Sequence, residues 1–265
     1  RPNLNFSNLH LRSNWGSSNY NSLQTSVNRR MANNFLAQVS YTYSKSIDYG
    51  SADQGPDSIG GNQVAMDPFH TNMECGRSSF DYTHVLKLNG IYELPFGNNQ
   101  LLKGWKLSGV YTLQSGPPFT VFTGFDRTGA GGPNNGNYRP NLAPGATGNP
   151  IIGQKDLWFD PTVFTLQAIG TYGNLGRSTA VGPGLQNVNF ALLKQTSVPR
   201  ISELFKVEFR AEVNNLANHP NYALPTATIF TSGTGTNGAR NAAAGKITGT
   251  VGGSRSVQFA LRLSI

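Results

Sequence analysis

The sequence predicts an all-β fold, an antiparallel transmembrane β-barrel, from the alternation within its strands and the lengths of its connections. The last eleven residues alternate without a break and place five apolar side chains on one face of a strand: Val257, Phe259, Leu261, Leu263 and Ile265. Residues 205–214 alternate apolar with charged side chains in the same way. Long strands with one apolar and one polar face are typical of membrane barrels, in which lipid-facing and lumen-facing residues alternate.

The same reasoning predicts eight strands in order along the chain. The expected strands are approximately 4–13, 19–29, 34–46, 79–94, 105–116, 186–196, 205–214 and 255–265. The first alternates poorly, whereas the others carry an apolar residue at most second positions. In the last two strands the polar face is charged, and we expect these side chains to face a lumen: Lys206, Glu208, Arg210, Glu212 and Arg262.

The connections differ in length in a regular way. Those near 31–33, 97–104 and 197–203 are short, and those near 47–78, 118–185 and 218–254 are long and rich in Gly, Pro, Asn and Ser. Short and long connections alternate along the chain, as do the short periplasmic turns and long external loops of outer-membrane barrels. The aromatic residues near the strand ends are consistent with two interfacial girdles.

Composition excludes several functional classes. The net charge is +8, but the basic residues are scattered, with Arg29 and Arg30 as the only adjacent pair, which argues against nucleic-acid binding. Cys75 is the only cysteine, so neither a disulfide framework nor a thiolate metal site is expected. The glycines of 233–238 match a dinucleotide motif only literally, because they follow no buried parallel strand.

Titratable residues give no catalytic or metal pattern. The four histidines share no ligand spacing, and we interpret the carboxylates of the 47–78 loop as solvated: Asp48, Asp53, Asp57 and Asp67. No triad can be assembled from the sequence order. We therefore expect no enzyme activity, no catalytic residue, no metal site and no cofactor. The chain opens without Met or a signal sequence, which suggests a processed chain or a fragment.

Seven segments occur in an order that is similar to a known family. They are NYNSLQ at 19–24, VSYTYSKSID at 39–48, YELPF at 92–96, GWKLSG at 104–109, QSGPPFT at 114–120, GNLGR at 173–177 and FRAEVNNLANHPN at 209–221. Together they resemble the C-terminal barrel portion of Oar-like TonB-dependent outer-membrane receptors of the acidobacterial type. The resemblance covers nearly all of residues 1–265.

The resemblance carries further expectations. It implies a 22-stranded barrel, monomeric and in the outer membrane of a Gram-negative bacterium, with a plug domain and a signal peptide that this chain does not contain. It also implies transport of a bulky ligand through a gated polar lumen, driven through contact of the missing N-terminal part with the TonB complex. The expected partners are membrane lipid, TonB and an unidentified ligand. We expect the 118–185 loop to contact that ligand through Phe122, Arg127, Tyr138, Arg139 and Trp158, because aromatic residues and Arg anchor many binding surfaces.

The residues leave alternatives open. The chain could be a complete eight-stranded barrel with a structural or adhesion role, in which side chains fill the interior. It could also be a secreted β-sandwich that binds glycans. In addition, the aromatic residues of the 118–185 loop could serve to pack the loop against itself and its neighbours.

Overall fold

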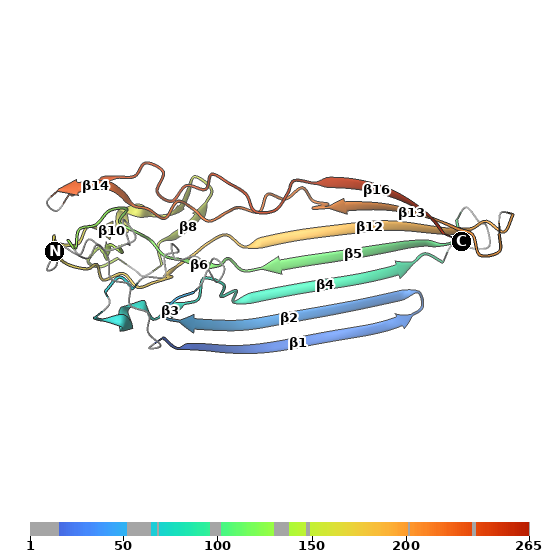
Figure 1. The fold of residues 1–265 in the computed structure, drawn as a ribbon, viewed down its shortest axis with the longest axis horizontal. Helices are drawn as coiled ribbons and strands as arrows, with labels where there is room; N and C mark the ends of the chain where they lie inside the picture. Colours follow the sequence, from blue (N-terminus) through green and yellow to red (C-terminus); the bar gives the residue numbers. More distant parts are fainter. Residues whose placement is uncertain are drawn as a thin grey trace, which may run out of the picture.

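The computed structural model of the chain describes residues 16–51, 65–67, 69–95, 102–129, 138–146, 149–200, 202–234 and 237–264. Its dominant element is an antiparallel sheet in which long strands follow one another in chain order (Figure 1). The long strands are β1 (Ser18–Ala32), β2 (Phe35–Asp48), β4 (His84–Glu93), β5 (Trp105–Gln114), β12 (Leu185–Ser197), β13 (Lys206–Asn214) and β16 (Ser256–Ser264). A two-residue strand, β3 (Gly76–Arg77), pairs with the end of β2.

The remaining elements are short and lie in the long connections. The 3₁₀ helices of the described residues are η1 (Thr71–Glu74) and η2 (Pro161–Val163). Four two-stranded sheets are formed by β6 (Pro118–Phe119) with β11 (Ala180–Val181), β7 (Asn141–Leu142) with β10 (Phe164–Thr165), β8 (Ile151–Gln154) with β9 (Leu157–Phe159), and β14 (Phe230–Thr234) with β15 (Asn237–Arg240). Among the described residues, no helix has the length and hydrophobicity needed to cross a membrane.

The predicted strands from the second to the eighth are confirmed as the seven long strands, while the one expected at 4–13 lies outside the described residues. The largest difference in a boundary is at β4, which begins at His84 instead of residue 79. Residues 78–83 form a turn there, in which the Asp81 carboxylate accepts the backbone N–H of Ser46 at 2.9 Å and the Asp81 N–H reaches the Ser78 carbonyl at 2.9 Å. The turn uses backbone groups that a longer strand would have placed in its ladder.

Short and long connections lie at opposite ends of the sheet, as predicted (Figure 1). Asn33 and Asn34 join β1 to β2 with positive φ angles of 51° and 64°, the conformation of a type I′ hairpin turn. Asn tolerates this left-handed region better than other residues with a Cβ atom. The three long connections all leave the other end of the sheet.

The strand register gives the sheet one apolar and one polar face. A single apolar row crosses six strands, from β16 to β2, through residues that are partners in the ladder: Phe259, Ala211, Leu192, Leu107, Tyr92 and Phe35. The charged residues of β13 fall on the other face, where Glu208 is opposite Arg262. The apolar side chains are uncovered, with Leu261 66% and Val27 64% exposed. The described part of the chain shows no second long sheet packed on this face, whereas two packed sheets define the sandwich alternative.

Buried apolar side chains lie in the long connections and not in the long strands. The enclosed hydrophobic residues of the described chain are Met66, Phe119, Val121, Tyr138, Phe159, Phe164, Leu166, Leu175, Ala180, Ile229, Phe230, Ala244 and Ile247. A sheet with lipid on one face and a polar space on the other has no dry interior of its own. The long connections must therefore build a hydrophobic core by themselves.

The sheet does not close within the described residues. β1 pairs only with β2 and β16 pairs only with β13, so the outer edges of β1 and β16 lack a partner there. Open edges of this length invite pairing with further strands. The expectation that the chain supplies only part of a barrel wall stays a prediction.

We expect β1 and β16 to be apart in the intact protein, because each edge should pair with strands other than those described. In a Cys75→Ser background, the pair Ala211→Cys with Phe259→Cys should form a disulfide in oxidised outer membranes, since these residues are ladder partners. The pairs Thr25→Cys with Phe259→Cys and Leu9→Cys with Phe259→Cys should not. Efficient formation of either of the latter disulfides would show closure of a small barrel.

Candidate functional site

The described residues of the long connections, within 49–83, 115–184 and 215–255, fold together at one end of the sheet into what we call the loop cluster. Its core contains aromatic residues from two of the three connections, and Phe159 lies between Phe119 and Phe164 at ring distances of 5.8 and 6.1 Å. Phe122, in the 115–184 connection, pairs with the 215–255 connection through a bridge to Thr228. The cluster is therefore one packed unit built from segments far apart in the sequence.

The five residues predicted to contact ligand all belong to this loop cluster. Tyr138, Arg139 and Arg127 are 1%, 3% and 6% exposed, whereas Phe122 and Trp158 are partly buried. The Trp158 indole N–H donates to the Val181 carbonyl at 2.8 Å. The structure thus brings these residues into the packing of the cluster, as in the alternative interpretation of the loop aromatics. Contact with a ligand stays a prediction.

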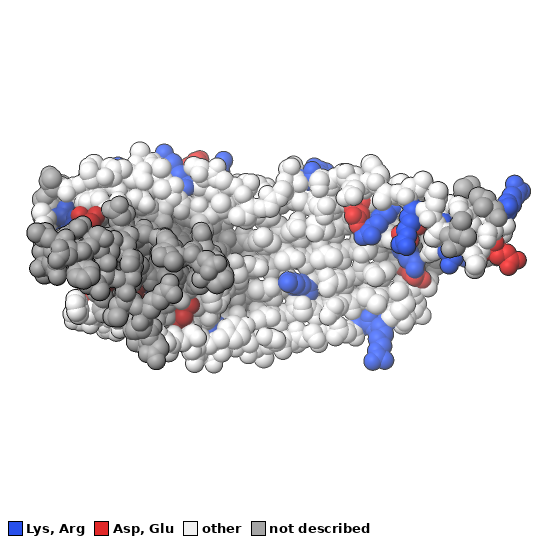
Figure 2. All heavy atoms as spheres, viewed as in Figure 1, with Lys and Arg blue, Asp and Glu red and all other residues white. Residues whose placement is uncertain are grey.

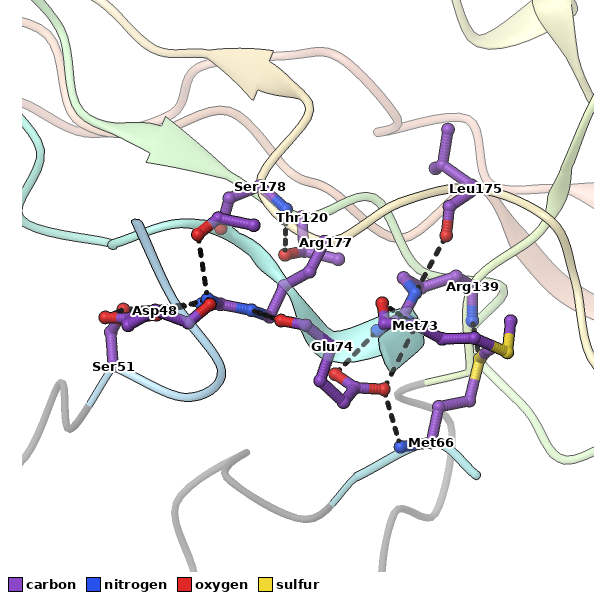
Figure 3. A network of polar contacts seen from close by, with 11 residues as sticks. Asp48, Ser51, Met66, Met73, Glu74, Thr120, Arg139, Leu175, Arg177 and Ser178 are labelled. Carbon is purple, nitrogen blue, oxygen red and sulfur yellow. Dashed lines mark hydrogen bonds and ion pairs between the residues drawn. The ribbon is translucent and has the colours of Figure 1, made fainter. Parts of the chain in front are cut away.

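Arg139 forms a buried ion pair with Glu74, which belongs to the first long connection (Figure 3). Its two terminal nitrogens donate to the two carboxylate oxygens of Glu74 at 2.9 and 3.0 Å. Its Nε donates to the Leu175 carbonyl at 2.9 Å, and the Glu74 carboxylate also accepts the backbone N–H of Met66 at 2.9 Å. The planar fork of Arg suits this bidentate geometry. The pair ties the 49–83 connection to the 115–184 connection.

Arg177 makes a second link, between the 115–184 connection and the end of β2 (Figure 3). Its guanidinium pairs with the Asp48 carboxylate and donates to the carbonyls of Glu74 at 2.8 Å and Gly76 at 3.2 Å. Close backbone contact explains Gly76, because a Cβ atom there would lie 2.6 Å from the Arg177 carbonyl oxygen. The arrangement anchors the loop cluster to the sheet.

The interpretation of Asp48 and Asp67 as solvated carboxylates is wrong. They are 6% and 5% exposed, while Asp53 and Asp57 lie outside the described residues. Sequence reasoning missed this because the partner of Asp48 is Arg177, 129 residues away. The GNLGR segment at 173–177 was the available signal, since Gly173 allows close approach to the Arg139 carbonyl and Arg177 binds Asp48.

Asp67 shows how the loops stabilise a buried carboxylate. Burial raises its pKa, but hydrogen bonds from His70 and the backbone N–H of Phe69 outweigh that effect, so the net pKa lies below the ordinary value. The His70 Nδ1 and the backbone nitrogen lie 2.6 and 2.9 Å from the carboxylate. A lowered pKa means that this contribution to stability is present above pH 3.8 and is lost as the pH falls through the folded-state pKa.

The five residues predicted to face a lumen share the polar face of the sheet. Arg210 pairs with Glu212 on β13, and Lys106 of β5 pairs with Glu93 of β4 at 2.7 Å on the same face. Figure 2 shows acidic and basic side chains gathered over the sheet toward the end away from the loop cluster. The register places these residues on one face, opposite the apolar one, and their position in a lumen stays a prediction.

The remaining observations concern the histidine, cysteine and carboxylate side chains. Among the described residues, no group of three or more His, Cys, Asp and Glu side chains is arranged to hold a metal ion. His84 shares a hydrogen bond with the Tyr41 hydroxyl at 2.8 Å and lies beside Tyr43 on the apolar face. Cys75 is exposed and has no disulfide partner.

Comparison with known proteins agrees with this geometry. No curated protein and no solved structure matches the chain. A family model described as an outer membrane beta barrel domain matches residues 1–258. The match covers nearly the whole chain. In an outer-membrane barrel lipid covers the apolar face, which explains why that face is uncovered here and lies opposite a charged one. The chain therefore belongs to the family of outer-membrane β-barrel domains, and the protein is located in the outer membrane.

Proposed function

We propose that residues 1–265 form the C-terminal part of the barrel of a TonB-dependent receptor that takes up a bulky ligand. In this proposal the apolar face contacts membrane lipid, the polar face lines the lumen, and the loop cluster lies outside the cell. A plug domain elsewhere in the protein closes the lumen and contacts the TonB complex. The barrel is monomeric, and the proposal assigns the chain no catalytic step.

The open sheet is the observation that supports this proposal most. Seven long strands run side by side and leave two edges without partners among the described residues, as expected for a segment of a wider wall. A wide lumen also suits the charged rows of the polar face. In a narrow barrel the interior is filled by side chains, and unpaired charges there would be costly. In a wide lumen the same charges remain in contact with water.

Two measurements on outer membranes test the proposal. Antibodies raised against residues 215–234, which lie in the loop cluster, should detect a polypeptide much larger than the 28.5 kDa of this chain. Formaldehyde treatment of intact cells should then yield a product that also reacts with antibodies against TonB. A band of 28.5 kDa with no TonB-containing product would instead favour the complete small barrel with a structural or adhesion role.

A further inference from the structure

A cavity of about 270 Å³ opens on the polar face, where the loop-cluster ends of β12, β13 and β16 meet the 215–255 connection. None of the eleven described residues that line it is charged or aromatic. Five of them are asparagines: Asn187, Asn189, Asn214, Asn215 and Asn221. The concentration of neutral amides here contrasts with the charged rows farther along the same face.

Two of these asparagines form a rigid frame. Asn215 is 7% exposed, and its amide nitrogen donates to the carbonyls of His219 at 3.0 Å and Gly253 at 3.2 Å. Its amide oxygen accepts the His219 N–H at 2.9 Å. Asn221 accepts the backbone N–H of Gln186 at 2.7 Å. These contacts bind the outgoing and returning parts of the connection to the top of β12, so the cavity wall is preorganised.

The strand asparagines present the remaining amide groups. Register places Asn187 and Asn189 on the polar face of β12, and the Asn187 amide nitrogen donates to the Asn189 amide oxygen at 3.2 Å. The amide oxygen of Asn187 is enclosed and has no hydrogen-bond partner among the described residues. An enclosed acceptor without a donor costs free energy. A rotation of the Asn187 amide toward the cavity that it lines would expose this oxygen to an O–H group of a bound molecule and remove that cost.

We propose that this cavity binds one unit of a neutral, hydroxyl-rich ligand, an oligosaccharide, on the lumen wall of the receptor. An amide group can both donate and accept hydrogen bonds, and so can a sugar hydroxyl. The absence of charge from the lining disfavours anionic chelates and phosphates, which recruit Arg or Lys. The inference rests on the proposed function and narrows its ligand to one chemical class.

The test uses the full-length receptor, purified in a detergent without a sugar headgroup and applied to an array of neutral, sulfated and sialylated oligosaccharides. We expect binding to neutral members. Asn187→Leu should lower the affinity for the best of them at least tenfold, because it removes the unpaired acceptor and the donor beside it. Gln195→Leu is the matched control, since Gln195 lies on the same face of β12, eight residues away, and should leave binding unchanged.

Heat-modifiable migration on gels verifies that each variant is folded, and Asn187→Ala replaces Asn187→Leu if the latter misfolds. Binding restricted to anionic glycans, binding to none, or unchanged affinity in both Asn187 variants would overturn the proposal. The crosslink to TonB is measured in intact cells that produce the same variants. It should persist when the glycan proposal alone fails and be absent when the proposed function fails.

Discussion

Replacing Glu74 by Ala should destabilise the loop cluster by about 3–5 kcal/mol, because it leaves the Arg139 guanidinium buried without its carboxylate. Side-chain exposures of 4% for Arg139 and 7% for Glu74 leave little room for water to compensate. Native-state hydrogen exchange of the detergent-solubilised protein measures the effect at the Ile229 amide, which donates to the Phe122 carbonyl within the cluster.

Glu203→Ala supplies the control, since Glu203 is exposed in the short β12–β13 connection at the opposite end of the sheet. The double variant Glu74→Leu with Arg139→Met should recover part of the lost stability, because replacing both members of a buried pair is often close to neutral. If exchange at Ile229 were the same in Glu74→Ala and in Glu203→Ala, the ion pair would not hold the loops together.

Leu261→Arg should lower the free energy of unfolding in lipid vesicles by about 2–4 kcal/mol if the residue lies near the middle of the bilayer. Leu261 is on the uncovered apolar face, opposite Phe209 and beside the stacked rings of Phe209 and Phe259. Arg262→Gln, one position farther along and on the polar face, should have a much smaller effect. Reversible urea unfolding in vesicles measures both, and equal losses would contradict the assignment of the two faces.

Sequence alternation predicted the long strands well because each depends on its own residues. The pattern at 255–265 requires only that apolar side chains recur at every second position, and β16 follows it from Ser256 to Ser264. The β1–β2 turn is equally local, since Asn33 and Asn34 supply the required positive φ angles. The face of each side chain followed from the same alternation, because a shift of one residue would bring charges such as Glu208 to the apolar face.

The loop cluster could not be predicted in this way, because its contacts are not local. Arg139 and Glu74 are 65 residues apart, and neither has a neighbour in sequence that marks it as part of a pair. The cavity lined by asparagines could not be predicted for the same reason, because its walls come from β12 and from the connection after β13, which are separated in sequence. The segment FRAEVNNLANHPN at 209–221 contained three of the five asparagines, but its composition alone did not indicate a cavity.

Because the hydrophobic core is separate from the long strands, the stability of the loop cluster and the stability of the sheet should respond to temperature differently. The core residues of the loop cluster leave contact with water on folding, so their unfolding should raise the heat capacity of the solution. The apolar face of the sheet is matched to hydrocarbon, and its stability depends on the lipid far more than on the hydration of apolar groups. Cooling therefore weakens the hydrophobic driving force that holds the loop cluster together. It has less effect on the apolar face of the sheet, which contacts lipid and not water.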